Sequence, residues 1–249
     1  MKTFKLLFIL VLFMMHFSAL NGQSAASLLR SMDELMSAPK DKESNVEMIL
    51  TDKSGKEKIR KATLKQKGPY KRLYRYTYPE KQIGVATLSM PDDIIWLYMP
   101  AFKKAVKITL LSKSQAFTGT DFSYEDMSGT SYEERYTPRI LDDSDPKVYK
   151  LELMPKSMKT KYSKIILYLN KEYFYPHRME YYDANKKHFK NADYEYVKKG
   201  QYWYAEKVLM TNINKNHSTE IRLTDMKFDQ GLSDEEFTVE NLKPLETAD

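Results

Sequence analysis

The sequence predicts a mainly β protein built on one wide, curled antiparallel sheet of about eleven strands. Three observations predict it. Short alternating apolar and polar runs follow one another from residue 46 to residue 228, with turn residues between them. One amphipathic helix precedes these runs. No linker, repeat or low-complexity segment divides the chain, and a sheet this wide curls instead of staying flat.

Residues 1–23 read as a signal peptide. Lys2 and Lys5 form a basic start, Leu6 to Phe17 an apolar segment, and the run to Gln23 is small and polar. The apolar segment is too short for a membrane-spanning helix. We therefore expect residues 24–249 to form a single domain outside the cytoplasm.

The composition limits the possible functions. The chain has no cysteine, which excludes disulfides and a lipidated cysteine at the mature N-terminus, so we expect a soluble protein that is not itself a lipoprotein. Without Lys2 and Lys5, 38 of the 40 basic residues remain against 34 acidic ones, a net charge of +4. This excess is too small to indicate nucleic acid. The 19 tyrosines suit an amphiphilic ligand.

The predicted helix covers residues 24–38. Ser24 is its expected N-cap, and Pro39 ends it. Its apolar side chains fall on one face at helical spacing, which must pack on another part of the protein. They are Ala25, Leu28, Leu29, Met32, Leu35 and Met36.

The central strand is the run 94–99, which is apolar on both faces. A strand of this kind predicts a core on one side and a lid or a bound ligand on the other. Pro100 ends it, a basic strand follows at 103–108, and a loop then displays Phe117, Phe122 and Tyr124. We interpret the region as the rim of a lipophilic cavity.

The second half of the chain continues the strand pattern. Residues 231–242 then predict a turn, a short helical piece and a final edge strand. The strands are expected at 132–141, 147–154, 163–170, 177–183, 188–197, 202–212 and 218–228.

The run Ile95-Trp96-Leu97-Tyr98-Met99-Pro100 and the strands around it resemble the LolA-like periplasmic lipoprotein-sorting carriers. The loop at 115–126 is similar to the outer-membrane lipoprotein-sorting subgroup, and Phe237-Thr238-Val239 also matches in position. The resemblance implies an unclosed β-barrel with a helical lid, whose apolar cavity carries acyl chains. It also implies a lid-latching arginine directly before the turn proline, where this chain has Gly68.

The sequence contains no strong pattern for a catalytic or metal-binding site. The chain has no cysteine and no G-x-S-x-G motif, and His177, His188 and His217 have no matching partner in the sequence. The acidic run 142–145 lacks the glycine and distal glutamate of a calcium loop, so a solvated turn is favoured. The lysines at 103, 104 and 107 could touch anionic headgroups, but a charged outer strand face is favoured.

These observations predict a periplasmic carrier without catalysis, metal or cofactor. It would shuttle a lipid or an acylated lipoprotein toward the outer membrane as a monomer with transient membrane contact, between an inner-membrane exporter and an outer-membrane acceptor. Two alternatives stay open: a lipid-sensing regulatory protein, and a surface-polymer hydrolase using Asp121 or Glu125. The predicted lipid-binding residues are Leu28, Leu29, Met32, Leu35, Leu88, Met90, Trp96, Tyr98, Phe117 and Phe122.

Overall fold

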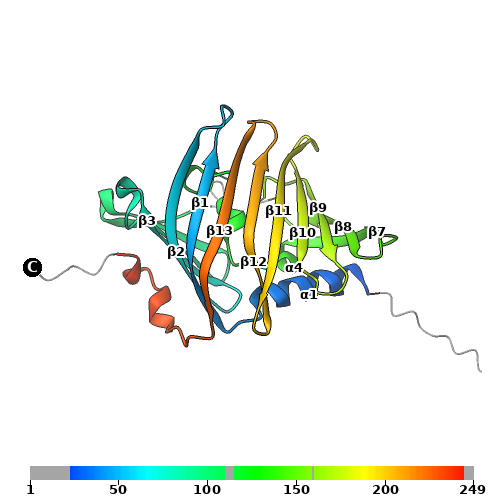
Figure 1. Ribbon diagram of the computed structural model, residues 1–249, viewed down its shortest axis with the longest axis horizontal. Helices are drawn as coiled ribbons and strands as arrows, with labels where there is room; N and C mark the ends of the chain where they lie inside the picture. Colours follow the sequence, from blue (N-terminus) through cyan, green and yellow to red (C-terminus); the bar gives the residue numbers. More distant parts are fainter. Residues whose placement is uncertain (1–22, 110–114, 159, 244–249) are drawn as a thin grey trace, which may run out of the picture.

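The computed structural model describes residues 23–109, 115–158 and 160–243 (Figure 1). The predicted signal peptide lies, apart from its last residue, outside the described residues and stays a prediction, as does the single domain from residue 24. Within the described ranges, no helix combines the length and the apolar character needed to cross a bilayer.

One antiparallel sheet of 13 strands dominates the fold, in the order β6-β5-β4-β3-β2-β1-β13-β12-β11-β10-β9-β8-β7. The predicted antiparallel sheet is confirmed. It has 13 strands, where the sequence predicted about eleven. The strands are β1 (Asp41–Thr51), β2 (Glu57–Lys67), β3 (Lys71–Tyr78), β4 (Ala86–Met90), β5 (Ile94–Met99), β6 (Lys104–Lys107), β7 (Tyr136–Asp142), β8 (Val148–Pro155), β9 (Lys164–Asn170), β10 (Pro176–Tyr182), β11 (His188–Lys199), β12 (Tyr202–Asn212) and β13 (His217–Phe228).

The pairing of β1 with β13 brings the first and last strands of the chain together in the middle of the sheet. β6 and β7 therefore form the two outer edges, and the sheet curls without closing, as an unclosed β-barrel (Figure 1). The chain between these edges carries the short helices α3 (Tyr124–Met127) and α4 (Tyr132–Arg135). The strand expected from residue 132 thus begins as α4 and continues as β7.

The long helix is α1 (Ala25–Ser37), and its Ser24 cap is confirmed. The Ser24 hydroxyl accepts a hydrogen bond of 3.1 Å from the Ser27 amide. Leu28, Leu29 and Met32 are buried beneath the helix. Because α1 contacts β12, α4 and β7, it lies across the concave side of the sheet (Figure 1).

The sheet carries an apolar cluster on each face. The larger cluster lies on the concave face and includes Met48, Tyr76 and Ile95. The smaller cluster, on the convex face, consists of Leu73, Ala86, Leu88, Tyr98, Leu232, Phe237 and Leu242. The second apolar face of β5 is therefore covered by the chain's own C-terminal segment, where the sequence predicted a lid or a ligand.

This C-terminal segment contains the short 3-10 helices η4 (Asp234–Phe237) and η5 (Glu240–Leu242). The final edge strand expected within 231–242 was wrong, because this segment packs its apolar side chains on the sheet face and adds no strand to the ladder. Three further 3-10 helices are η1 (Glu80–Gln82), η2 (Pro100–Phe102) and η3 (Phe117–Gly119).

Asp41, at the start of β1, anchors the C-terminal segment. Its buried carboxylate accepts hydrogen bonds from the backbone amides of Gln230, Gly231 and Leu232 at 2.7, 2.9 and 3.0 Å. Three donors on one carboxylate hold the chain at the point where it leaves β13 and turns over the convex face.

We expect Asp41→Ala to lower the free energy of unfolding by about 1–3 kcal/mol, because three backbone amides lose their acceptor. Urea denaturation of the variant and the parent protein measures this loss. Asp143→Ala, at an exposed turn position, is the matched control and should stay within about 0.5 kcal/mol. Equal stability of the two variants would contradict the anchoring role.

Candidate functional site

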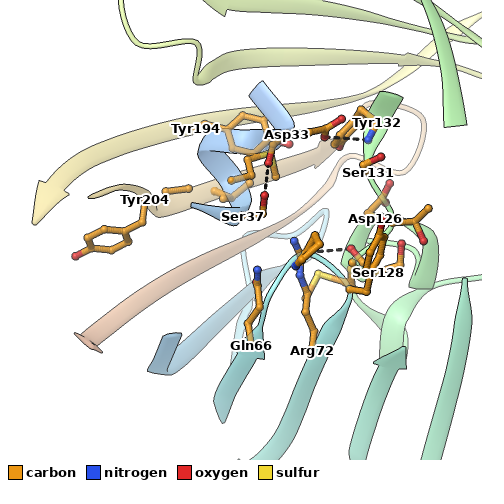
Figure 2. A pocket seen from close by; sticks show the side chains of 18 of the residues that line it. Asp33, Ser37, Gln66, Arg72, Asp126, Ser128, Ser131, Tyr132, Tyr194 and Tyr204 are labelled. Carbon is orange, nitrogen blue, oxygen red and sulfur yellow. Dashed lines mark hydrogen bonds between the residues drawn. The ribbon is translucent and has the colours of Figure 1, made fainter. Parts of the chain in front are cut away.

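A cavity of about 440 Å³ lies between α1, α4 and the concave face of the sheet (Figure 2). This volume is within the usual range for small-molecule pockets. Its apolar wall comes mainly from β2, β12 and β13, and an aromatic group from β10 to β12 closes one side. These residues are Leu64, Val208, Met210, Ile221 and Leu223, with Tyr181, Tyr194, Tyr196, Trp203 and Tyr204.

A second wall is the loop of residues 128–131, which depends on Gly129. A Cβ atom at this position would lie 2.5 Å from the carbonyl oxygen of Tyr70 and 2.6 Å from that of Pro69. The Gly129 amide also donates to the Ser89 hydroxyl at 3.1 Å. Only a residue without a side chain lets this loop approach the β2–β3 turn so closely.

Asp33, which lines the cavity, attaches α1 to α4 (Figure 2). Its two carboxylate oxygens accept hydrogen bonds from the backbone amides of Tyr132 and Glu133 at 2.9 and 2.8 Å. Burial raises the pKa of Asp33, and the two amides oppose that rise. An exposed ion pair, Arg30 to Glu133 at 2.7 Å, lies beside this contact.

Gly68 occupies the position where the family resemblance implied a lid-latching arginine. Its backbone has a φ of +56°, which favours glycine, and its amide donates to the Lys40 carbonyl at 2.8 Å. The helix is thus attached through Asp33 and Arg30 on α1 itself, and residue 68 contributes only backbone.

A buried ion pair fixes α3 to the sheet. The Lys190 ammonium of β11 lies 2.7 Å from a carboxylate oxygen of Asp126, and the two side chains are 1% and 7% exposed. Asp126 also accepts from the Tyr162 hydroxyl at 2.8 Å and from the Ser123 amide at 2.7 Å. Burial alone would raise the pKa of Asp126, but Lys190 and the Ser123 amide hold it below its ordinary value.

Glu125, the next carboxylate, is also engaged. It accepts hydrogen bonds from Tyr136 at 3.2 Å and from Thr160 at 2.8 Å, and Arg135 lies 3.5 Å away. Burial raises its pKa despite the neighbouring Arg135. Glu125 and Asp126 are therefore buried structural groups. Their contacts tie α3 to β7 and β11.

The sequence left His217 without a partner, but the structure supplies one. Its Nδ1 lies 2.6 Å from Asp121, whose carboxylate also accepts from the Thr219 hydroxyl at 2.8 Å. The Thr219 hydroxyl donates its hydrogen bond to the Asp121 carboxylate, so it is not paired as a nucleophile with the His217 imidazole. Asp121 and His217 also lie outside the cavity lining.

Of the cationic residues that line the cavity, Lys42 and Arg72 come from the sheet, on β1 and β3. Burial and the charge of Arg72 lower the pKa of Lys42 to about 7. Burial also lowers the pKa of Arg72. Arg72 donates from Nη1 to the Ser128 carbonyl at 2.8 Å, while its buried Nε has no hydrogen-bond partner.

The predicted lipid-binding residues fall into three groups. Leu28, Leu29 and Met32 are buried in the concave cluster under α1, and Leu35 is half-buried on the same helix. Phe117 and Phe122 join that cluster, and Phe122 also lines the cavity. Leu88 and Tyr98 lie in the convex cluster, with Met90 and Trp96 packed against it. A lipid contact by any of the ten stays a prediction.

The concave cluster instead receives the alternate side chains of β5. Ile95 is buried in the concave cluster and Leu97 packs against it. A shift of one residue exchanges the two faces of a strand, and in β5 Trp96 and Tyr98 lie on the convex side while Ile95 and Leu97 lie on the concave side. Because β5 is apolar on both faces, its sequence held no signal to decide between them.

Sequence reasoning missed most of the cavity. Tyr194 and Tyr196 alternate with acidic residues in β11, so their spacing placed both on one face and could have indicated an aromatic wall. Arg72 and Lys42 carried no such signal, because a charged residue on a strand usually faces water.

No metal centre is found among the residues that the structure describes: no three of their His, Cys, Asp or Glu side chains gather around one point. The acidic run 142–145 is a turn, in which Asp142 accepts from the Ser144 amide at 2.9 Å and Asp145 from the Lys147 amide at 2.7 Å. This agrees with the favoured interpretation of that run.

Fold and cavity define a class of protein: an unclosed antiparallel barrel with a helix over an internal hollow. A family model described as "Uncharacterized protein" matches residues 68–244. That match spans more than half of the chain, so the protein belongs to this family. No curated protein matches the sequence significantly.

Solved structures confirm the resemblance to LolA-like lipoprotein-sorting proteins. A domain from Vibrio parahaemolyticus named as an outer-membrane lipoprotein-sorting protein is 28% identical, with a TM-score of 0.82 over 88% of this chain and 97% of that one. A DUF1329 family protein from Desulfovibrio piger is 23% identical, with a TM-score of 0.81 over 88% and 98%. A LolA superfamily protein from Nitrosomonas europaea is 22% identical, with a TM-score of 0.74 over 88% and 99%.

We expect Lys190→Met to lower the free energy of unfolding by about 3–5 kcal/mol, because it leaves the Asp126 carboxylate buried without its counter-ion. Chemical denaturation measures the loss. Adding Asp126→Asn should recover most of it, whereas Lys187→Met, at an exposed position of the same hairpin, should change little. A double variant no more stable than Lys190→Met would contradict this account.

We expect Asp33→Ala to loosen α1 without unfolding the sheet, because two amides of α4 lose their acceptor, a loss of about 1–2 kcal/mol. Amide hydrogen exchange in residues 25–37 should accelerate about tenfold. Glu34→Ala changes the exposed neighbouring carboxylate and is the control. Equal exchange in the two variants would show that Asp33 does not hold the helix.

Proposed function

We propose that this protein is a periplasmic carrier that binds the hydrocarbon chain of a lipid, or the acyl groups of a lipoprotein, and shields it from water without catalysis. The observation that carries the proposal is the cavity of about 440 Å³ beneath α1, with Val208, Met210 and Ile221 in its wall. Each buried methylene group contributes roughly 0.8 kcal/mol, so an acyl chain supplies a large driving force for binding.

The attachment of α1 supports a carrier. The helix packs Leu28, Leu29 and Met32 into the concave cluster, and its Met36 and Ser37 line the cavity. Its polar contacts to α4 are those of Asp33 and Arg30. Moving the helix aside would break these contacts and expose Leu28, Leu29 and Met32, so loading and release require a membrane or a partner protein that covers this apolar face. The similarity to a domain named for lipoprotein sorting points in the same direction.

The location and the route belong to the same proposal. The sequence of residues 1–23 predicts export. We propose that loading takes place at the inner membrane and release at the outer membrane, each through transient contact with a partner protein.

We expect Val208→Trp to reduce the lipid that co-purifies with the protein, because the larger ring occupies space that the acyl chain needs. Mass spectrometry of organic extracts from the native protein, normalised to protein amount, measures the loss. Leu209→Trp is the matched control, since Leu209 lies next along β12 and outside the cavity lining. Absence of lipid from the parent protein, or equal lipid in both variants, would contradict the proposed function.

A further inference from the structure

Lys42, Gln66 and Arg72 form a row of hydrogen-bond donors across β1, β2 and β3. Lys42 is paired with Gln66, and Gln66 with Arg72. Directly paired residues point to the same face of a sheet, and all three line the cavity. Figure 2 shows Gln66 and Arg72 side by side, directed into it. Strands lie about 4.8 Å apart, so the backbones of the two cationic residues are roughly 10 Å apart.

The donors of this row are only partly used by the protein, and Gln66 donates one hydrogen bond to the Gly68 carbonyl at 3.0 Å. Arg72 donates from Nη1 to the Ser128 carbonyl at 2.8 Å, but its buried Nε has no partner. The Lys42 ammonium reaches the Met36 carbonyl at 3.4 Å, longer than a usual hydrogen bond. A buried guanidinium nitrogen without an acceptor is unfavourable, and Nε belongs to the fork that binds carboxylate or phosphate.

The carboxylates around the cavity do not neutralise these two cations. Asp33 binds the amides of α4, Asp126 is paired with Lys190, and Glu133 is paired with Arg30. Glu134 accepts from the Tyr70 hydroxyl at 2.6 Å, and Glu34 is exposed. Among the residues that the structure describes, no carboxylate forms an ion pair with Lys42 or Arg72. The cavity therefore combines an apolar wall on β12 and β13 with a positive, donor-rich end on β1 to β3.

We propose that the ligand is an anionic amphiphile, whose carboxylate or phosphate group is held by Lys42, Gln66 and Arg72 and whose hydrocarbon chain lies along Val208, Met210 and Ile221. The assignment rests on the carrier function proposed above. A neutral lipid would leave the buried donors unsatisfied, and a small inorganic anion would leave the apolar wall without a ligand. An amphiphile with an acid group satisfies both parts of the cavity.

The test compares three ligands that share one chain length: dodecanoate, dodecyl phosphate and dodecanol. Titration calorimetry with the delipidated mature protein, below the micelle concentration of each ligand, measures the affinities. We expect both anionic ligands to bind at least about tenfold more tightly than dodecanol, as charged hydrogen bonds to a buried group predict. Arg72→Met and Lys42→Met should each remove most of this preference, measured as the ratio of the anionic affinities to the dodecanol affinity.

Lys104→Met, at an exposed position of the edge strand β6, is the control and should keep the preference. Circular dichroism confirms folding, and Lys42→Met keeps the test decisive if loss of the Arg72 contact to Ser128 impairs folding. Equal affinity for the three ligands, or a preference that persists in both variants, would overturn the anionic assignment and leave the carrier function standing. Inorganic phosphate binding as tightly as dodecyl phosphate would also overturn it. Failure of all three amphiphiles to bind would overturn the carrier function itself.

Discussion

The pairing of β1 with β13 is the constraint on which the rest of the structure depends. It joins the strands from both halves of the chain into a single ladder of 13 strands. Adjacent strands twist in a fixed sense, so a ladder of this width must curl and acquires a concave face. The chain enters that ladder at Asp41, with α1 directly before it, so the same pairing brings the helix to the mouth of the hollow. The C-terminal segment leaves from β13 beside it and covers the convex face.

The two faces of the sheet are covered in different ways. The convex cluster around Leu88 and Tyr98 is filled by the chain's own C-terminal residues, including Phe237 and Leu242. On the concave face, α1 covers a sheet too wide for one helix of 13 residues to fill. A cavity remains for this reason, and its volume depends on the loop at Gly129, which brings the opposite wall close to the β2–β3 turn.

The buried charged side chains fall into two groups: those with an ionic partner and those without one. Asp126 with Lys190 ties the connection between the sheet edges to β11, and Glu125 with Arg135 joins α3 to α4 within that connection. These pairs are surrounded by further donors, which is the condition under which a buried ion pair is tolerated. Lys42 and Arg72 lack such compensation, and they occur where the hollow is open to a ligand. Uncompensated charge confined to a cavity is more typical of a binding site than of a scaffold.

The sequence by itself determined the repeated strands, the capped helix that begins after Ser24, and the resemblance carried by the run 95–100. These features are local. The strand period of two, the helix period of 3.6 and the motif can be recognised without knowing which strands pair. Only the tertiary structure decided which face of β5 points inward, because apolar residues on both faces leave that choice to the elements that cover each side. It alone joined Lys190 to Asp126 and placed Lys42 in line with Arg72, since strand register between distant segments follows from the curl of the whole sheet.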